Sequence, residues 1–312
     1  MMSSAPMMLM HSKGRTEPRR RTKHPDTKVA LLMLAPAMIL LSIFVLWPLV
    51  YAWIVSFYTW SFYEESAFVG LGNFRMVLKD PVFWASLRRG LTFSVVVVPS
   101  ILVLAFLFAN LVKTMGTRMA TVLKAAIYIP TVISGVIASI VFVLIYEYRQ
   151  GVLNWVLSLV GVADTAWLGS AQTALYALTL PAVWLGLGLA SLIMLAGLLD
   201  IPESYYEAAE LEGAGWWQRT IHITLPLMKN ILLYLLVTGF VGAIQQYELP
   251  LVMTAGGPTQ STLLPNLLIF QHFNNDLYVG YSIAAALLLF LVLGGLSAVI
   301  FRLINSEKAV DG

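Results

Sequence analysis

Few side chains of this chain could take part in covalent chemistry, and their spacing does not favour catalysis. The sequence has 312 residues and no cysteine, which excludes disulfides, thiolate metal sites and cysteine nucleophiles. The four histidines are His11, His24, His222 and His272, and they lie too far apart in sequence to form a metal-ligand pattern. We therefore expect no catalytic residue, no metal site and no cofactor on this chain.

A polar cluster inside an apolar segment is the most unusual chemical feature. It consists of Gln245, Gln246, Tyr247 and Glu248. An acidic group at the centre of a membrane span costs about 2.5–3.5 kcal/mol, so Glu248 should face protein or a watery cavity. Amide, carboxylate and aromatic groups suit a hydroxyl-rich solute, which makes Gln245, Tyr247 and Glu248 candidates for a solute pathway. The alternative is a hydrogen-bond cluster that holds helices of two subunits together.

The composition requires a membrane around these residues. The chain is 59% hydrophobic and 11% charged, whereas soluble domains are about 45–50% apolar and about 25% charged. A soluble fold of this size could not bury so much apolar surface, but in a bilayer the lipid-facing positions must be apolar as well. The sequence therefore predicts an all-α membrane protein.

A span needs about 20 apolar residues, and the sequence offers six such segments. They cover about 29–57, 90–112, 120–146, 172–199, 229–253 and 279–304. Residues 1–28 form a basic tail and residues 305–312 a C-terminal tail, with the transmembrane domain expected between them at 29–304. Prolines that interrupt spans are tolerated in membranes because neighbouring helices satisfy the freed carbonyls.

The distribution of Lys and Arg orients the spans. Fourteen of the 19 basic residues fall in the two tails, in the connections after spans two and four, or near the span ends that adjoin them. Positive charge collects on the cytoplasmic side, so both termini should be cytoplasmic. Arg19-Arg20-Arg21 is interpreted as part of this anchor rather than as a nucleic-acid site.

The connection at about 200–228 carries the most informative pattern. Acidic residues favour a helix start near Asp200 and Glu203, with Ser204 and Glu207 as a second choice. Gly213 is suited to end that helix in a left-handed conformation, and Pro226 suits the first turn of span five. The pattern predicts a helix, a glycine turn, a second short helix and re-entry into the membrane. It would present Glu207 and the small Ala208-Ala209 surface to a partner.

This connection resembles the EAA loop of binding-protein-dependent ABC importer permeases. The matching positions are Glu207, Ala208, Ala209, Gly213, Ile223, Leu225 and Pro226, with Glu212 where the family usually has Asp. Other segments are similar to the maltose-type carbohydrate branch. They are Leu34 to Phe57, Phe68 to Phe74, Asp80 to Trp84, Thr254 to Pro258 and Gly280 to Ala284.

The resemblance implies a type I ABC importer permease fold in the bacterial inner membrane. It also implies four kinds of partner: a second homologous permease, a dimer of ATPase subunits, an extracytoplasmic solute-binding protein and a carbohydrate substrate. The pattern GxxxxGK[ST] is absent, so ATP and Mg²⁺ should bind the ATPase subunits rather than this chain.

Three further interpretations stay open. Gly256-Gly257-Pro258 should form an external turn near the solute entrance, and it is either a contact for the binding protein or a plain turn. The cargo could be a glycerol-phosphate, a polyol or a polyamine, although no basic residue lies inside spans four to six between Lys229, at the start of span five, and Arg302. An ion-coupled secondary transporter is the alternative class; it would need ionisable residues near the midplane, of which Glu248 is one.

Overall fold

The computed structural model describes residues 26–60, 66–274 and 279–305. Most of the two predicted tails therefore lies outside the described residues. Contacts divide the chain into two compact units, residues 1–51 and 52–312. The first unit holds α1 (Asp26–Leu41), the π-helical segment η1 (Ser42–Leu46) and the start of α2 (Trp47–Val55). Together these elements give an apolar helical run over Val29–Val55, which matches the first predicted span.

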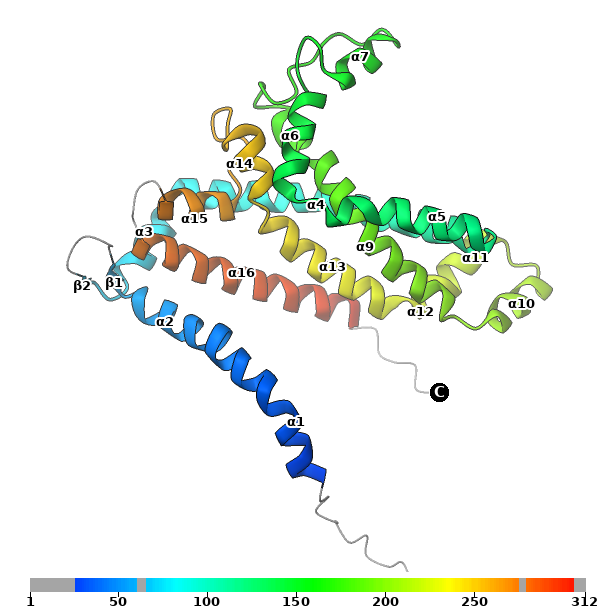
Figure 1. Cartoon of the computed structure of the whole chain (residues 1–312), viewed down its shortest axis with the longest axis horizontal. Coiled ribbons are helices and arrows are strands. Elements are labelled where there is room, and N and C mark those ends of the chain that lie inside the picture. Colours follow the sequence, from blue (N-terminus) through cyan, green and yellow to red (C-terminus); the bar gives the residue numbers. More distant parts are fainter. Residues whose placement is uncertain (1–25, 61–65, 275–278, 306–312) are drawn as a thin grey trace, which may run out of the picture. The chain divides into compact units, whose positions relative to one another are not determined.

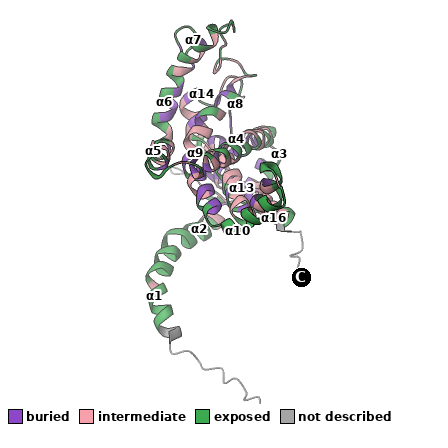
Figure 2. Ribbon diagram, turned by 90° about the vertical axis from the view of Figure 1, so that its right-hand side faces the viewer, coloured by how far each residue is buried: buried purple, intermediate pink, exposed green. Residues whose placement is uncertain are grey.

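The second unit is built on four long helical segments that lie alongside one another (Figure 1). They are α4 (Pro81–Lys113), α9 (Thr179–Leu199) preceded by α8 (Ala174–Ala177), α13 (Lys229–Ile244) and α16 (Val279–Asn305). α4 packs against α9 and α13, and α16 packs against α13. Most of their outward-facing apolar residues remain exposed (Figure 2), as expected of helices that face lipid. The all-α prediction and the positions of spans four and six are confirmed.

Helix α4 begins earlier than predicted. The expected second span started near residue 90, but α4 starts at Pro81, where the Asp80 side chain accepts a hydrogen bond from the Val82 amide at 2.8 Å. An acidic N-cap followed by proline at the first helical position is a strong start signal. Arg88 and Arg89, which were expected to precede the span, therefore lie within α4.

The third predicted span is not one straight helix. Its first part is α5 (Thr117–Tyr128), followed by the 3₁₀ segment η2 (Ile129–Val132), and its second part is α6 (Gly135–Ile145). The two parts are bent by 98°. The break contains Pro130, which removes a backbone donor, and Ser134, whose hydroxyl accepts from the Val136 amide at 3.3 Å and restarts the helix. The segment predicted at about 120–146 is therefore present as a bent pair of helices, and its proline lies at the bend.

The fifth predicted span is also interrupted. α13 ends at Ile244, and α14 (Glu248–Thr254) begins after three non-helical residues. α14 then packs against α6 (Figure 1), so the second halves of the two broken spans lie together.

Short elements complete the connections between spans. β1 (Tyr58–Thr59) and β2 (Ala67–Phe68) form an antiparallel pair ahead of α3 (Gly72–Lys79). α7 (Val152–Ser158) follows α6, and α15 (Pro265–Asn274) precedes α16.

Four sequence segments that the family resemblance singled out meet at the α3 end of the unit. Asn73 donates to the backbone carbonyls of Ser56 and Tyr58 at 2.8 and 2.9 Å. Gly280 lies so close to Asn73 that a Cβ there would come within 2.7 Å of its Nδ2. The hydroxyl of Tyr281 donates to Asp80, across 201 positions of sequence. These contacts tie the starts of α4 and α16 together.

Candidate functional site

The predicted helix–turn–helix lies at the end of the unit opposite α3 (Figure 1). It comprises α10 (Glu203–Leu211), α11 (Trp216–Arg219), the π-helical segment η3 (Thr220–Thr224) and α12 (Leu225–Leu227). We call residues 200–228 the coupling segment, after the role that the family resemblance implies for them. Its order of elements confirms the pattern expected from the sequence.

The start of α10 differs from both predicted capping pairs. Its N-cap residue is Pro202, which makes no side-chain capping bond. Proline fixes φ near the value that a helix entry needs, and Glu203 in the first turn complements the helix dipole. The acidic residues therefore act through charge rather than through a capping bond.

The end of α10 is the glycine turn that the sequence predicts. Gly213 has φ +78°. Its amide donates to the Glu210 carbonyl, and the Ala214 amide donates to the Ala209 carbonyl, both at 2.9 Å. This pair of bonds closes a helix through a left-handed residue, a conformation that glycine adopts without steric cost. Gly213 thus sets the angle between α10 and α11.

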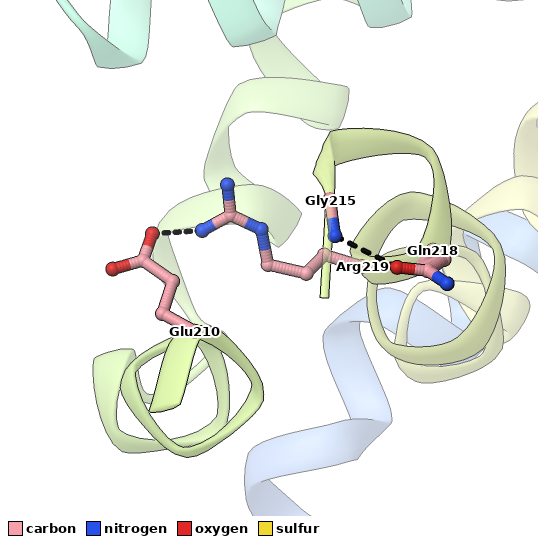
Figure 3. Close-up of polar contacts among 4 residues, drawn as sticks. All are labelled: Glu210, Gly215, Gln218 and Arg219. Carbon is pink, nitrogen blue, oxygen red and sulfur yellow. Dashed lines mark hydrogen bonds and ion pairs between the residues drawn. The ribbon is translucent and has the colours of Figure 1, made fainter. Parts of the chain in front are cut away.

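Polar contacts brace the turn from the other side (Figure 3). Arg219 of α11 forms an ion pair with Glu210 of α10. The side chain of Gln218 accepts from the Gly215 amide at 2.8 Å and caps the start of α11. Because the ion pair joins α10 to α11, the two short helices can move as one piece.

The outward surface of the coupling segment is both acidic and apolar. Glu207 and Ala208 are exposed, and Leu211 and Trp217 are 92% and 69% exposed. Exposed large apolar residues at this density, with acidic neighbours, are typical of a protein contact surface. A hollow of about 340 Å³ lies beside them, lined by Ala209, Glu212, Gly213, Ala214, Gln218, Arg219, His222 and Ile223.

The remaining motif residues lie where the chain returns to the helices. Ile223 belongs to η3, and Leu225 and Pro226 form the start of α12. Pro226 therefore stands in the first turn of α12 and not of α13, which begins at Lys229. The proline needs no amide hydrogen bond at that position.

The predicted pathway residues stand at the break between α13 and α14. Gln245 and Tyr247 are exposed, and Glu248 is partly exposed. Asn266 of α15 donates to the Gln245 carbonyl at 2.8 Å. The side-chain oxygen of Gln246 accepts from the amides of Tyr247 and Glu248 at 2.9 and 3.2 Å. The break is thus held by polar side chains that replace the lost helical bonds.

The polar side chains around this break lie against different surroundings. Gln246 lines a cavity of about 420 Å³ between α4, α9 and α13, together with Tyr234 and Thr238. Tyr247 lines a second cavity of about 350 Å³ with Asn266 and Phe270. Glu248 packs against the start of α6, where a Cβ built on Gly135 would overlap its carboxylate. That helix N-terminus favours a negative charge.

The predicted external turn lies between α14 and α15. Gly256 has φ +88° and is buried against Leu263 and Leu267. The Thr262 hydroxyl donates to the Gly257 carbonyl at 2.9 Å. Gly257 and Pro258 are partly exposed, and the following Thr259 and Gln260 are fully exposed.

Two features of these sites were missed from the sequence. Gln246 was given less weight than Gln245, yet it is the glutamine that lines the larger cavity. Tyr206 was not considered, although it and Ala209 are the only partly buried described residues of α10. A helical spacing of three between Tyr206 and Ala209 could have indicated an inward face.

Comparisons with known proteins agree with this geometry. Residues 89–309 match the family described as the binding-protein-dependent transport system inner membrane component. The chain is 33% identical over 266 residues to the trehalose/maltose transport system permease protein MalF of Thermococcus litoralis, covering 85% of this chain and 90% of that protein. It is 32% identical over 287 residues to the sulfoquinovosyl glycerol transport system permease protein SmoG of Agrobacterium fabrum, covering 90% and 92%.

A solved structure has the same fold. It is a bacterial ABC transporter involved in the import of the acidic polysaccharide alginate, with a TM-score of 0.76 and 20% identity. The match covers 90% of this chain and 96% of that one. The fold, the helical spans and the sequence match lead to one conclusion: the chain belongs to the inner membrane component family of binding-protein-dependent transport systems.

Proposed function

We propose that this chain forms half of the translocation pathway of an ATP-driven importer for a sugar or oligosaccharide, and that its coupling segment docks separate ATPase subunits. The observation that carries the proposal is the outward face of α10. Glu207 and Leu211 are exposed there, four residues apart on one helix, and the left-handed turn at Gly213 ends that helix directly after them. A glutamate beside small alanines suits a cleft that offers a basic residue.

The cargo is inferred from the relatives and from the lining of the larger cavity. The names of the two relatives refer to trehalose or maltose and to sulfoquinovosyl glycerol. Polar groups on the cavity wall come from Tyr234, Thr238 and Gln246, and no charged side chain is among its described lining residues. Neutral donors and acceptors suit hydroxyl groups and leave a phosphate ester or a polyamine without a counter-charge on this chain.

The same geometry disfavours an ion-coupled carrier. Such a carrier needs an ionisable group at the solute site near the midplane. Glu248 is the acidic candidate, and it packs against the start of α6 rather than lining the larger cavity. In this proposal ATP hydrolysis supplies the energy for transport. ATP and Mg²⁺ bind the ATPase subunits, and this chain has no ATPase site of its own.

The orientation follows from the coupling role. If α10 meets a cytoplasmic ATPase, the coupling segment and both termini face the cytoplasm, and the α3 end faces outward. The turn at Gly256-Gly257-Pro258 would then lie outside, where its exposed neighbours Thr259 and Gln260 are available to the solute-binding protein. The second homologous permease would close the other side of the pathway.

The docking role of Glu207 is tested by Glu207→Ala in the complete transporter, reconstituted with its own ATPase subunits. Loss of the pairing charge should release the ATPase more readily, with a drop in co-purified ATPase of roughly tenfold, as for about 1.4 kcal/mol of binding free energy. Glu203→Ala is the matched control, because Glu203 is an exposed acidic residue on the same helix. Equal retention of ATPase in wild type and Glu207→Ala would contradict the docking role.

The turn is tested by Gly213→Ala. A side chain at φ +78° costs about 1–2 kcal/mol, so the turn should open more often and hydrogen exchange at the Ala214 amide should rise about 5- to 30-fold. The control is Gly215→Ala, because Gly215 has φ −71° and space for a Cβ. Unchanged exchange in Gly213→Ala would mean that the left-handed turn does not hold the segment.

The role of Glu248 is tested by Glu248→Gln, which keeps the shape and removes the charge. If Glu248 belongs to the solute pathway, the transporter should assemble while the KM or maximal rate of uptake changes for some sugars. Failed assembly would instead indicate the interhelical role. Unaltered kinetics across a panel of candidate sugars would refute the pathway role.

A further inference from the structure

Helix α10 has an inward face as well as the outward face that carries Glu207. Tyr206 is partly buried, whereas its neighbours Tyr205 and Glu207 on either side are exposed. Successive residues of a helix point about 100° apart, so Tyr206 faces the helical bundle when Glu207 faces outward. The inward face is therefore where a displacement of α10 can reach the transmembrane helices.

Tyr206 makes two specific contacts with other elements. The Nζ atom of Lys113 lies 4.6 Å from the centroid of the Tyr206 ring, within the range of a cation–π interaction. The hydroxyl of Tyr206 lies 3.0 Å from the hydroxyl of Thr224, which is only 4% exposed. Lys113 is the last residue of α4, and Thr224 ends η3. One side chain thus joins α10 both to a transmembrane helix and to the second half of the coupling segment.

The ring also packs against an apolar cluster at this end of the bundle. Tyr206 contacts a core that includes Val112 of α4, Ala120 of α5 and Leu198 of α9. Tyr206 is therefore held by Lys113 over its ring, by Thr224 at its hydroxyl and by packing against this cluster.

The backbone connection between α9 and α10 does not by itself transmit movement of α10 to the membrane helices. Asp200, Ile201 and Pro202 separate α9 from α10, whereas the turn at Gly213 and the Glu210–Arg219 ion pair join α10 to α11. The non-helical residues before α10 interrupt the helical hydrogen bonds that would couple it directly to α9. A side chain of α10 that packs against the bundle supplies that connection.

Helix α4 is well placed to carry the movement onward. It runs without a break from Pro81 to Lys113, and Phe93 and Val97 on it line the larger cavity. At its far end Asp80 is bonded to Tyr281 of α16. At 1.5 Å per residue, such a helix spans roughly 50 Å. Displacement of α4 at Lys113 would therefore move residues that line the larger cavity and residues at the opposite end of the bundle.

We infer that Tyr206 is a positioning residue that passes the displacement of α10 to α4 through Lys113, so that ATP hydrolysis by the docked partner moves the pathway. The inference rests on the proposed function, in which α10 docks the ATPase. Loss of the Tyr206–Lys113 contact should leave docking intact and separate hydrolysis from transport.

The test measures ATP hydrolysed per solute imported, together with ATPase retention, in the complete reconstituted transporter. Tyr206→Leu keeps apolar packing and removes the ring and hydroxyl. Lys113→Met keeps the length and removes the charge. Each variant should retain the ATPase and raise the ratio of ATP to solute at least fivefold. The double variant should be no worse than the more affected single variant, because both remove the same contact.

Conservative and neighbouring variants serve as controls. Tyr206→Phe and Lys113→Arg keep the ring and the charge, so both should stay within about twofold of the wild-type ratio. Tyr205→Leu changes the exposed neighbour and should not alter the ratio.

Three results would overturn the inference. The first is a wild-type ratio of ATP hydrolysed to solute imported in Tyr206→Leu. The second is a double variant in which the two single increases in that ratio add. The third is failed assembly of Tyr206→Leu together with a normal ratio in Lys113→Met. The last would show that Tyr206 only packs. Failure of the proposed function is distinguishable, because it would appear as unchanged ATPase retention in Glu207→Ala.

Discussion

Backbone groups that lose their helical partners inside a membrane must find other partners in the protein, and this requirement governs both broken spans. At the first break the Ser134 hydroxyl accepts from the Val136 amide and caps α6. At the second break the Gln246 side chain accepts from the Tyr247 amide just before α14, and the Asn266 side chain donates to the Gln245 carbonyl. Non-helical backbone at membrane depth is tolerated where protein or a watery cavity surrounds it. The polar residues at these breaks therefore stabilise the fold through hydrogen bonds to the backbone, whatever their role in transport.

The same requirement explains why the breaks accompany cavities. Ending α13 at Ile244 places Gln246 on the wall between α4, α9 and α13. It also lets α14 turn toward α6, so that Glu248 lies against the start of that helix. A continuous fifth helix would hold Gln246, Tyr247 and Glu248 in one turn. Because the helix is interrupted, Gln246 and Tyr247 line two different cavities and Glu248 packs against α6. At the other end of the unit, the coupling segment is a compact, self-braced piece whose contact with the bundle includes Tyr206.

Local requirements were readable from the sequence, and long-range contacts were not. Gly213 was predictable because only glycine adopts the left-handed turn without cost, and the surrounding pattern defines a helix on each side. The apolar spans were predictable because lipid demands their composition. The size of the bend near Pro130 was not, because proline is compatible with both a kinked and a broken membrane helix. The choice between Gln245 and Gln246 depends on α15, which contributes Asn266 from a later part of the chain. The partners of Tyr206 and of Asp80 are likewise set by packing between distant segments.

The most direct test of the account places a single photo-crosslinking probe on the outward face of α10. The chain has no cysteine, so Leu211→Cys can be labelled specifically, and Leu211 is 92% exposed. A probe at Gln260→Cys, in the exposed turn after α14, serves as the reference. In the assembled transporter the probe at 211 should cross-link to the ATPase subunit, and the probe at 260 should not. Cross-linking of the ATPase from position 260, or none from position 211 while the ATPase remains bound, would contradict the central claim that the coupling segment is the docking site.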